Sequence, residues 1–223
     1  VEQVLVANPD QALFVFACAD PDPNFRMLDR FLVVAEREDI PAVICANKID
    51  LVEPRSARQE FGLYEGLGYP VLYTSAKTGK GVRKLRKLLQ GKLSVLAGPS
   101  GVGKTSLLNA VQPGLGLRTK AISRASGKGR HATVVPELIP LEMGGYVADT
   151  PGLRALGLWD IEPEELDAYF REIRPLVAAC EFSDCTHIHE PGCAVIAAVK
   201  RGEIAPERYD SYVRIRQGDL ESL

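Results

Sequence analysis

The most chemically specific segment of the chain is a glycine-rich stretch suited to binding phosphate. Residues 98–105 read Gly-Pro-Ser-Gly-Val-Gly-Lys-Thr, the phosphate-loop pattern of a glycine, four residues and Gly-Lys-Thr, between a strand-like and a helix-like apolar stretch. In such a loop, backbone N–H groups turn toward the phosphates at a helix N-terminus. We predict that Lys104 assists catalysis at the β- and γ-phosphates and that Thr105 binds Mg²⁺. The expected phosphate-binding residues are Ser100, Gly101, Val102, Gly103, Lys104, Thr105 and Ser106.

A second motif, Asn47-Lys48-Ile49-Asp50, could select the base. It follows the apolar run 42–46, so we expect it at the carboxyl end of a strand, where open parallel sheets bind ligands. Guanine offers two adjacent donors, its ring N1–H and its amine, and the Asp50 carboxylate can accept both. Asn47 can bond the base and brace the loop, while the Lys48 stem lies over the ring.

Ser75, Ala76 and Lys77 form a third motif after another strand-like stretch. A backbone N–H of this motif can donate to the guanine O6 atom. Each of the two base motifs, taken alone, is also compatible with an ordinary turn. Together with the phosphate loop in one chain, they predict a guanine-nucleotide site.

A fourth motif, Asp149-Thr150-Pro151-Gly152, follows a short apolar strand and completes the set. We expect Asp149 to hold Mg²⁺ through water and the Gly152 N–H to bond the γ-phosphate, so that loss of this phosphate releases the segment. The alternative is a strand followed by a Pro-Gly turn. Leu153 stands where many GTPases place a glutamine that orients the attacking water, so another group must do this.

The candidate for that task is His131, in the polar stretch 123–133. A histidine there could position water, and Thr133 could complete the magnesium shell; the alternative for His131 is a solvated loop residue. Cations gather around it, and either keep a solvated loop mobile or contact RNA phosphates. These cations are Arg118, Lys120, Arg124, Lys128 and Arg130.

Three cysteines and a histidine near the C-terminus form a different constellation, C-x4-C-x-H-x5-C. Three thiolates and one imidazole suit a closed, tetrahedral structural zinc site, with His189 as a rival to the motif's own histidine. Disulfides are the alternative, but five cysteines leave one unpaired and no signal peptide is apparent. Cys18 and Cys45 lie in apolar strand patterns and are expected in the core. The predicted zinc ligands are Cys180, Cys185, His187 and Cys193.

The elements that must position these groups alternate between strands and helices up to about residue 155, and the pattern then becomes helical. The base motifs precede the phosphate loop, which reverses the usual order. We therefore predict an α/β fold with a circularly permuted P-loop GTPase domain, residues 1–155, built on a doubly wound, mostly parallel sheet. A small helical zinc-binding domain, residues 156–223, follows it.

The composition fits a soluble protein of this kind. A chain of 223 residues can bury one α/β core plus a small appendage, and the net charge of -2 gives no strong global attraction to nucleic acid. No apolar run approaches membrane-spanning length, so we expect a cytoplasmic protein without a membrane partner.

The motif order, the Gly-Lys-Gly-Arg-His stretch, the Asp-Thr-Pro-Gly-Leu turn and the cysteine cluster resemble the RsgA family (also called YjeQ or YloQ) over essentially the whole chain. The resemblance implies GTP hydrolysis to GDP with Mg²⁺, stimulated by the 30S ribosomal subunit, a role in late 30S maturation and contacts with 16S rRNA; we expect a monomer. The family carries an N-terminal OB-fold domain, whereas this chain begins almost at the first GTPase strand, so we expect a fragment or a shortened form. The family usually has consecutive threonines after Arg-His, but here Ala132 and Val134 flank Thr133.

Two function classes remain open at this point. The complete magnesium and phosphate set favours a GTP-hydrolysing ribosome-assembly factor. Leu153 favours a nucleotide-dependent RNA- or protein-binding switch with only incidental hydrolysis. GTP turnover with and without 30S subunits distinguishes them.

Overall fold

The computed structural model describes residues 8–117, 137–149 and 161–218. These residues fall into two compact units. The first takes in residues 8–23, 40–117 and 137–149, and the second takes in 24–39 and 161–218. The segment 24–39 therefore groups with the C-terminal residues, although it lies inside the range that the sequence assigned to the nucleotide-binding domain. No helix in the described ranges is long and apolar enough to span a membrane.

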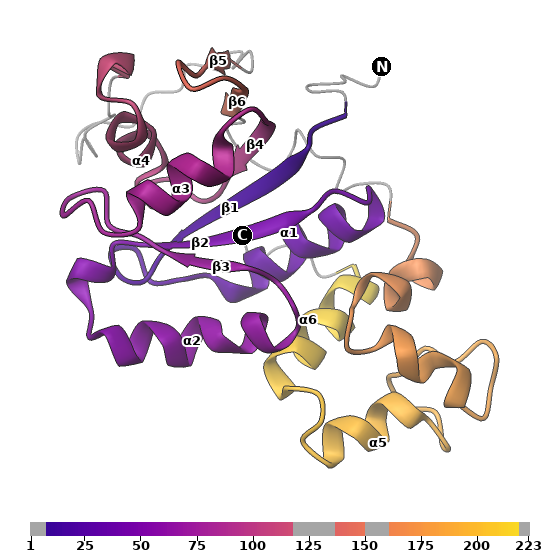
Figure 1. Cartoon of the computed structure of the whole chain (residues 1–223). Coiled ribbons are helices and arrows are strands. Elements are labelled where there is room, and N and C mark those ends of the chain that lie inside the picture. The colour runs from indigo at the N-terminus through magenta and orange to yellow at the C-terminus, as the bar shows by residue number, and fades with distance from the viewer. Residues whose placement is uncertain (1–7, 118–136, 150–160, 219–223) are drawn as a thin grey trace, which may run out of the picture. The chain divides into compact units, whose positions relative to one another are not determined.

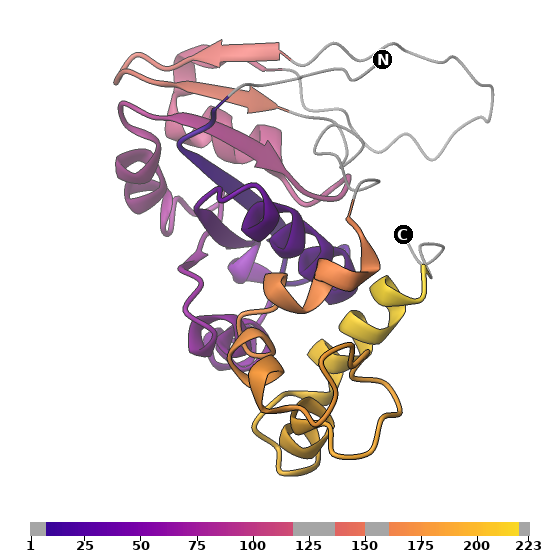
Figure 2. The same cartoon turned by 90° about the vertical axis from the view of Figure 1, so that its right-hand side faces the viewer.

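The first unit is built on a six-stranded sheet in the order β3-β2-β1-β4-β6-β5 (Figure 1). Every neighbouring pair is parallel except the β5–β6 pair, a hairpin at one edge that Figure 2 shows. The predicted doubly wound, mostly parallel sheet is confirmed. The strands are β1 (Gln11–Ala17), β2 (Ala42–Asn47), β3 (Val71–Tyr73), β4 (Leu93–Ala97), β5 (Glu137–Pro140) and β6 (Tyr146–Asp149).

Helices cover the sheet because its central strands are apolar on both faces. All residues of β1 and β2 are buried, which is typical of parallel strands between two layers of helices. The helices α3 (Val82–Leu89) and α4 (Lys104–Val111) pack their leucines on one face, and α2 (Pro54–Gly66) lies on the other (Figure 1). Two single turns of 3₁₀ helix, η1 (Ile49–Leu51) and η2 (Pro113–Leu115), connect these elements.

The sheet brings the strand ends to one edge. In the parallel register, Ala17 is opposite Asn47, Ala46 is opposite Tyr73, and Leu96 is opposite Asp149. The segments after β2, β3, β4 and β6 therefore all leave the sheet at the carboxyl ends of the strands, where ligands bind in this class of sheet. The ends are staggered, since β2 ends opposite Ala17 of β1 and β4 ends opposite Phe14.

The second unit is helical. Its core is a separate cluster of buried apolar side chains, to which Val33, Leu166, Phe170 and Tyr212 belong. Asn24 caps the first helix of this unit, since its Oδ1 accepts the Met27 N–H at 3.0 Å. The elements are α1 (Phe25–Arg37), η5 (Pro163–Tyr169), η6 (Arg174–Ala179), α5 (Ala194–Lys200) and α6 (Pro206–Arg216).

A buried arginine on α6 joins the parts of this unit. The Arg208 side chain is 1% exposed; its Nη1 lies 2.7 Å from an Asp29 carboxylate oxygen on α1, and its Nε lies 2.6 Å from Glu172. The guanidinium also stacks over the Phe170 ring, 4.6 Å from its centroid. Arg208 thus pairs with a carboxylate 179 residues earlier in the chain and with another 36 residues earlier.

Replacing Arg208 with methionine should destabilise the second unit by about 3–5 kcal/mol, because it leaves two buried carboxylates without their cation. Urea unfolding monitored by circular dichroism measures the loss. Arg201→Met is the matched control, since Arg201 pairs with Glu203 at the surface, where an ion pair contributes about 0–1 kcal/mol. Equal stabilities of the two variants would contradict the prediction.

Candidate functional site

The phosphate loop lies between β4 and α4, as the sequence predicts. Its first glycine, Gly98, has a φ of +152°, and a Cβ atom there would lie 2.1 Å from the Val15 carbonyl oxygen of β1. Gly101 and Gly103 also have positive φ, and Gly103 is the N-cap of α4. Val102 is buried in the core and anchors the loop. The glycines are therefore required by geometry as well as by the motif.

Lys104 already lies against the loop that it is predicted to serve. Its Nζ donates to the carbonyl oxygens of Gly98 at 2.7 Å and Pro99 at 2.9 Å. Thr105 follows in the first turn of α4, where backbone N–H groups lack intrahelical partners. This arrangement can receive an anionic phosphate chain.

A hydrogen bond ties the base motif to the phosphate loop. The Asn47 Nδ2 donates to the Val102 carbonyl oxygen at 2.8 Å, and the Asn47 Oδ1 accepts from the Thr74 hydroxyl at 3.1 Å. Asn47 is buried, so these bonds fix its amide. The bracing role that the sequence predicts for Asn47 has a direct structural counterpart.

The Asp50 carboxylate is exposed, and its surroundings favour the ionised form. The Ser75 hydroxyl donates to an Asp50 carboxylate oxygen at 2.6 Å, and this bond is the main cause of a lowered Asp50 pKa, with smaller contributions from the Lys77 and Lys48 charges. Lys48 has a left-handed φ of 60°, and its Nζ donates to the Asp20 carbonyl oxygen. An ionised carboxylate can accept both guanine donors.

The third motif is adjacent to Asp50 through the same hydroxyl. The Ser75 N–H donates to the Lys80 carbonyl oxygen at 2.9 Å, so this amide is already engaged. The neighbouring Ala76 N–H is therefore the better candidate for the guanine O6 atom. Lys77 is exposed beside it.

The fourth motif is only partly described. Asp149 ends β6 opposite Leu96, which places its backbone beside the strand that leads into the phosphate loop. Gly152, Leu153, His131 and Thr133 lie outside the described residues.

Replacing Gly103 with alanine should weaken guanine-nucleotide binding about 10-fold or more, because a Cβ atom at this position would lie 2.6 Å from the Asn47 Nδ2 and disturb the bond to Val102. Fluorescence titration with a labelled GDP measures the affinity. Gly91→Ala is the control: Gly91 also has positive φ, but a Cβ atom there would meet nothing within 4 Å. A similar loss in both variants would mean that backbone strain, not the Asn47 contact, is responsible.

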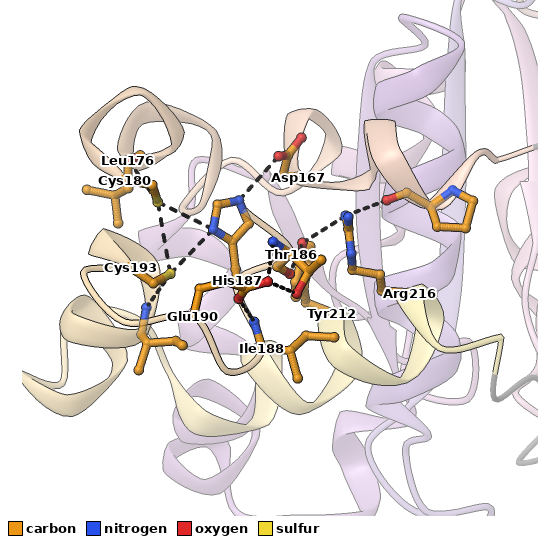
Figure 3. Close-up of polar contacts among 12 residues, drawn as sticks. Asp167, Leu176, Cys180, Thr186, His187, Ile188, Glu190, Cys193, Tyr212 and Arg216 are labelled. Atoms are coloured by element: carbon orange, nitrogen blue, oxygen red, sulfur yellow. Dashed lines mark hydrogen bonds and ion pairs between the residues drawn. The ribbon is translucent and has the colours of Figure 1, made fainter. Parts of the chain in front are cut away.

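The second unit holds the predicted metal ligands together. The ligand atoms of Cys180, Cys185, His187 and Cys193 all lie within 4.8 Å of one another (Figure 3 shows the surroundings). The Sγ atoms of Cys180 and Cys193 are 3.9 Å apart, and the His187 Nδ1 lies 3.5 and 3.4 Å from them. Zinc bonds of about 2.3 Å to sulfur and about 2.0–2.1 Å to nitrogen in a tetrahedron give edges of roughly 3.5–3.8 Å. The donor set fits a four-coordinate zinc ion.

The surroundings of the ligands favour metal binding. The His187 Nε2 faces an Asp167 carboxylate oxygen at 3.3 Å, which leaves Nδ1 for the metal (Figure 3). Cys193 is the N-cap of α5, and its Sγ accepts the Ile196 N–H at 3.4 Å. Burial raises the pKa of the Cys185 thiol to about 12, so a metal must displace its proton on binding.

A carboxylate organises the loop that carries His187. Glu190 accepts from the N–H groups of Thr186, Ile188 and His189 and from the Thr186 hydroxyl, and these bonds lower its pKa against the opposing effect of burial. The Tyr209 hydroxyl donates to the His187 carbonyl oxygen at 2.7 Å. His187 is thereby held at a left-handed φ of 61°.

Sequence reasoning missed these supporting residues. Asp167 precedes its histidine by 20 residues and Tyr209 follows it by 22, and no local pattern links them. The rival ligand His189 is exposed and does not belong to the cluster.

Comparison with known proteins places the chain in context. A family model described as RsgA GTPase matches residues 1–159. A relative named small ribosomal subunit biogenesis GTPase RsgA, from Gemmatimonas aurantiaca, is 54% identical over 96% of this chain and 70% of its own length. The protein of the same name from Moorella thermoacetica is 50% identical over 93% of this chain and 71% of its own length.

Two solved structures resemble the chain closely. The crystal structure of YjeQ from Thermotoga maritima has a TM-score of 0.81 and 44% identity, covering 98% of this chain and 74% of that one. The structure of YloQ, described as a circularly permuted GTPase, has a TM-score of 0.74 and 39% identity, covering 95% and 68%. The circular permutation that the motif order indicates thus has a counterpart in a protein of known structure, YloQ.

Proposed function

Because the chain belongs to the RsgA GTPase family, we propose that it binds GTP with Mg²⁺, hydrolyses it to GDP and assists late maturation of the 30S ribosomal subunit. One observation carries the nucleotide part of this proposal. The hydrogen bond from Asn47 to Val102 joins the guanine-reading motif to the phosphate loop, so the two halves of a guanine-nucleotide site form one unit.

The residues divide the task by their chemistry. Lys104 and the loop N–H groups neutralise charge on the phosphates, and Thr105, Thr133 and Asp149 would hold Mg²⁺, which withdraws negative charge from the β- and γ-phosphates. Asp50 selects guanine, and the Gly152 N–H senses the γ-phosphate. Leucine at position 153 has no hydrogen-bonding group, so water must be positioned by another residue.

We assign that role to His131. Its replacement by alanine should lower the rate of GTP hydrolysis by about 10²–10⁴-fold, the range for loss of a general acid–base group, and leave GTP affinity near normal. Single-turnover hydrolysis and nucleotide titration measure the two quantities. An unchanged rate in the variant would remove His131 from the mechanism.

Turnover in the presence of 30S subunits tests the function as a whole. We expect purified subunits to stimulate GTP hydrolysis strongly, because the relatives are named for biogenesis of this subunit. Nucleotide-dependent binding without stimulation would instead support the alternative, a switch with incidental hydrolysis. A cytoplasmic monomer in contact with 16S rRNA completes the proposal, and sedimentation with and without subunits tests it.

The metal centre is proposed to hold one structural zinc ion. Four protein donors fill a tetrahedral shell, so no position stays open for substrate. Its task is to stabilise the second unit, which has irregular backbone between residues 180 and 193.

A further inference from the structure

Charge is distributed very unevenly along the chain. All 29 Asp and Glu residues lie outside residues 66–136, whereas 13 of the 27 Lys and Arg residues lie inside this range. Residues 66–136 are therefore strongly basic, although the net charge of the whole chain is -2. In the described part of this segment, the cations concentrate on helix α3.

Helix α3 has one apolar face and one cationic face. Leu85 and Leu89 are buried in the core of the first unit. Four cations on the opposite side are exposed and form what we call the α3 basic face, with exposed Lys80 just before the helix. The α3 basic face consists of Arg83, Lys84, Arg86 and Lys87.

The protein itself does not compensate these charges. Within the described ranges, none of the four cations forms an ion pair. Arg83 and Arg86, like Lys84 and Lys87, are three residues apart on the helix, and like charges at this spacing repel. Arg83 and Lys84 also occupy the first turn, where the helix dipole disfavours cations and where α3 has no acidic residue.

The helix dipole favours Arg86 and Lys87 in the last turn, but it does not account for Arg83 and Lys84 in the first turn. On α6, by contrast, Arg214 lies 3.0 Å from Asp210, one turn earlier. The α3 basic face is therefore a surface whose mutual repulsion a bound polyanion would relieve.

We propose that the α3 basic face binds the phosphate backbone of RNA. This inference rests on the proposed function, because a protein acting on a ribosomal subunit meets RNA as its main polyanion. The helix is about 12 Å long, and a nucleic-acid duplex carries about one charge per 1.7 Å of axis, so several phosphates fall within reach of the four side chains. The face contains no aromatic residue for base stacking, so it positions the protein on RNA without reading sequence.

The test uses a 20-base-pair RNA duplex as the probe, titrated at several KCl concentrations. The variant R83Q/K84Q/R86Q/K87Q should bind at least about 10-fold more weakly at low salt and lower the slope of log K against log salt by about 2. R83Q/R86Q should show part of this loss, and R83K/R86K should retain binding. R55Q/R58Q is the matched control, because it also removes two exposed arginines three residues apart on a helix, α2.

Three outcomes would overturn the proposal: an unchanged affinity and slope in the fourfold variant, an equal loss in R55Q/R58Q, or a loss of 30S association with duplex binding intact. The last would assign the face to an acidic protein surface. GDP affinity and melting temperature verify that each variant is folded. GTP turnover is also measured on the unmodified chain without subunits. An unmodified chain that does not hydrolyse GTP would refute the proposed GTPase activity, but the RNA affinities of the variants could still be compared.

Discussion

An Asp50→Asn variant is expected to bind GTP about 100-fold or more weakly and to bind xanthosine triphosphate better than the unmodified chain does. The Asp50 carboxylate is exposed, ionised and held by the Ser75 hydroxyl, so it can accept both guanine donors. Hydrogen bonds to a charged group contribute about 1.5–3 kcal/mol each, so the loss of two of them weakens GTP binding by about 100-fold or more. Xanthine has a carbonyl oxygen where guanine has its amine, and an asparagine amide can donate to it.

Competition between labelled GDP and unlabelled GTP, XTP and ATP measures the change in preference. Asp39→Asn is a suitable control, because Asp39 is also exposed and asparagine tolerates its positive φ. A variant that loses GTP and XTP alike would indicate that Asp50 supports the loop and does not read the base.

The positions of the candidate nucleotide-binding motifs in the fold could be predicted from the sequence because parallel strands share a direction. Once residues 42–46, 71–73 and 93–97 were assigned as strands, the motifs after them had to emerge at one edge of the sheet. The contact between Asn47 and Val102 could not be predicted, since it depends on the path of two loops 55 residues apart.

The sequence did not indicate which segments of the chain form the second unit. Helix α1 has the apolar periodicity of any helix on a sheet, and its buried Asp29 resembles a solvated residue. Its partner Arg208 is 179 residues away, and a buried arginine follows no local pattern. Periodicity indicates that a helix has an apolar face but not which part of the chain covers it.

The cluster of four possible metal ligands was predictable for the opposite reason. Thiolates and imidazoles that bind one metal ion often lie close together in the sequence. A short segment is therefore enough to identify them. The choice between His187 and His189 depended on the loop around Glu190, which turns one imidazole inward and leaves the other exposed.

Replacing His187 with alanine is expected to have the largest effect on stability. The variant should lose stoichiometric zinc and lower the free energy of unfolding of the second unit by several kcal/mol, because structural zinc contributes about 10–16 kcal/mol in small metal-dependent domains and this unit also has its own apolar core. Metal analysis after dialysis and thermal unfolding measure the two effects. His189→Ala is the matched control, and we expect a change within about 0.5 kcal/mol for this exposed side chain.

A third variant distinguishes a metal ligand from a packed histidine. Asp167→Asn keeps the shape of the carboxylate that faces the His187 Nε2, so a purely structural histidine should tolerate it, whereas a ligand should lose about 10–100-fold in zinc affinity. The expected order of zinc loss is therefore His187→Ala, then Asp167→Asn, then His189→Ala. Zinc retained by His187→Ala and lost by His189→Ala would reverse the assignment. GDP affinity should survive in all three variants, because Asn47, Asp50 and the phosphate loop belong to the other unit, whose core contains none of the four proposed zinc ligands.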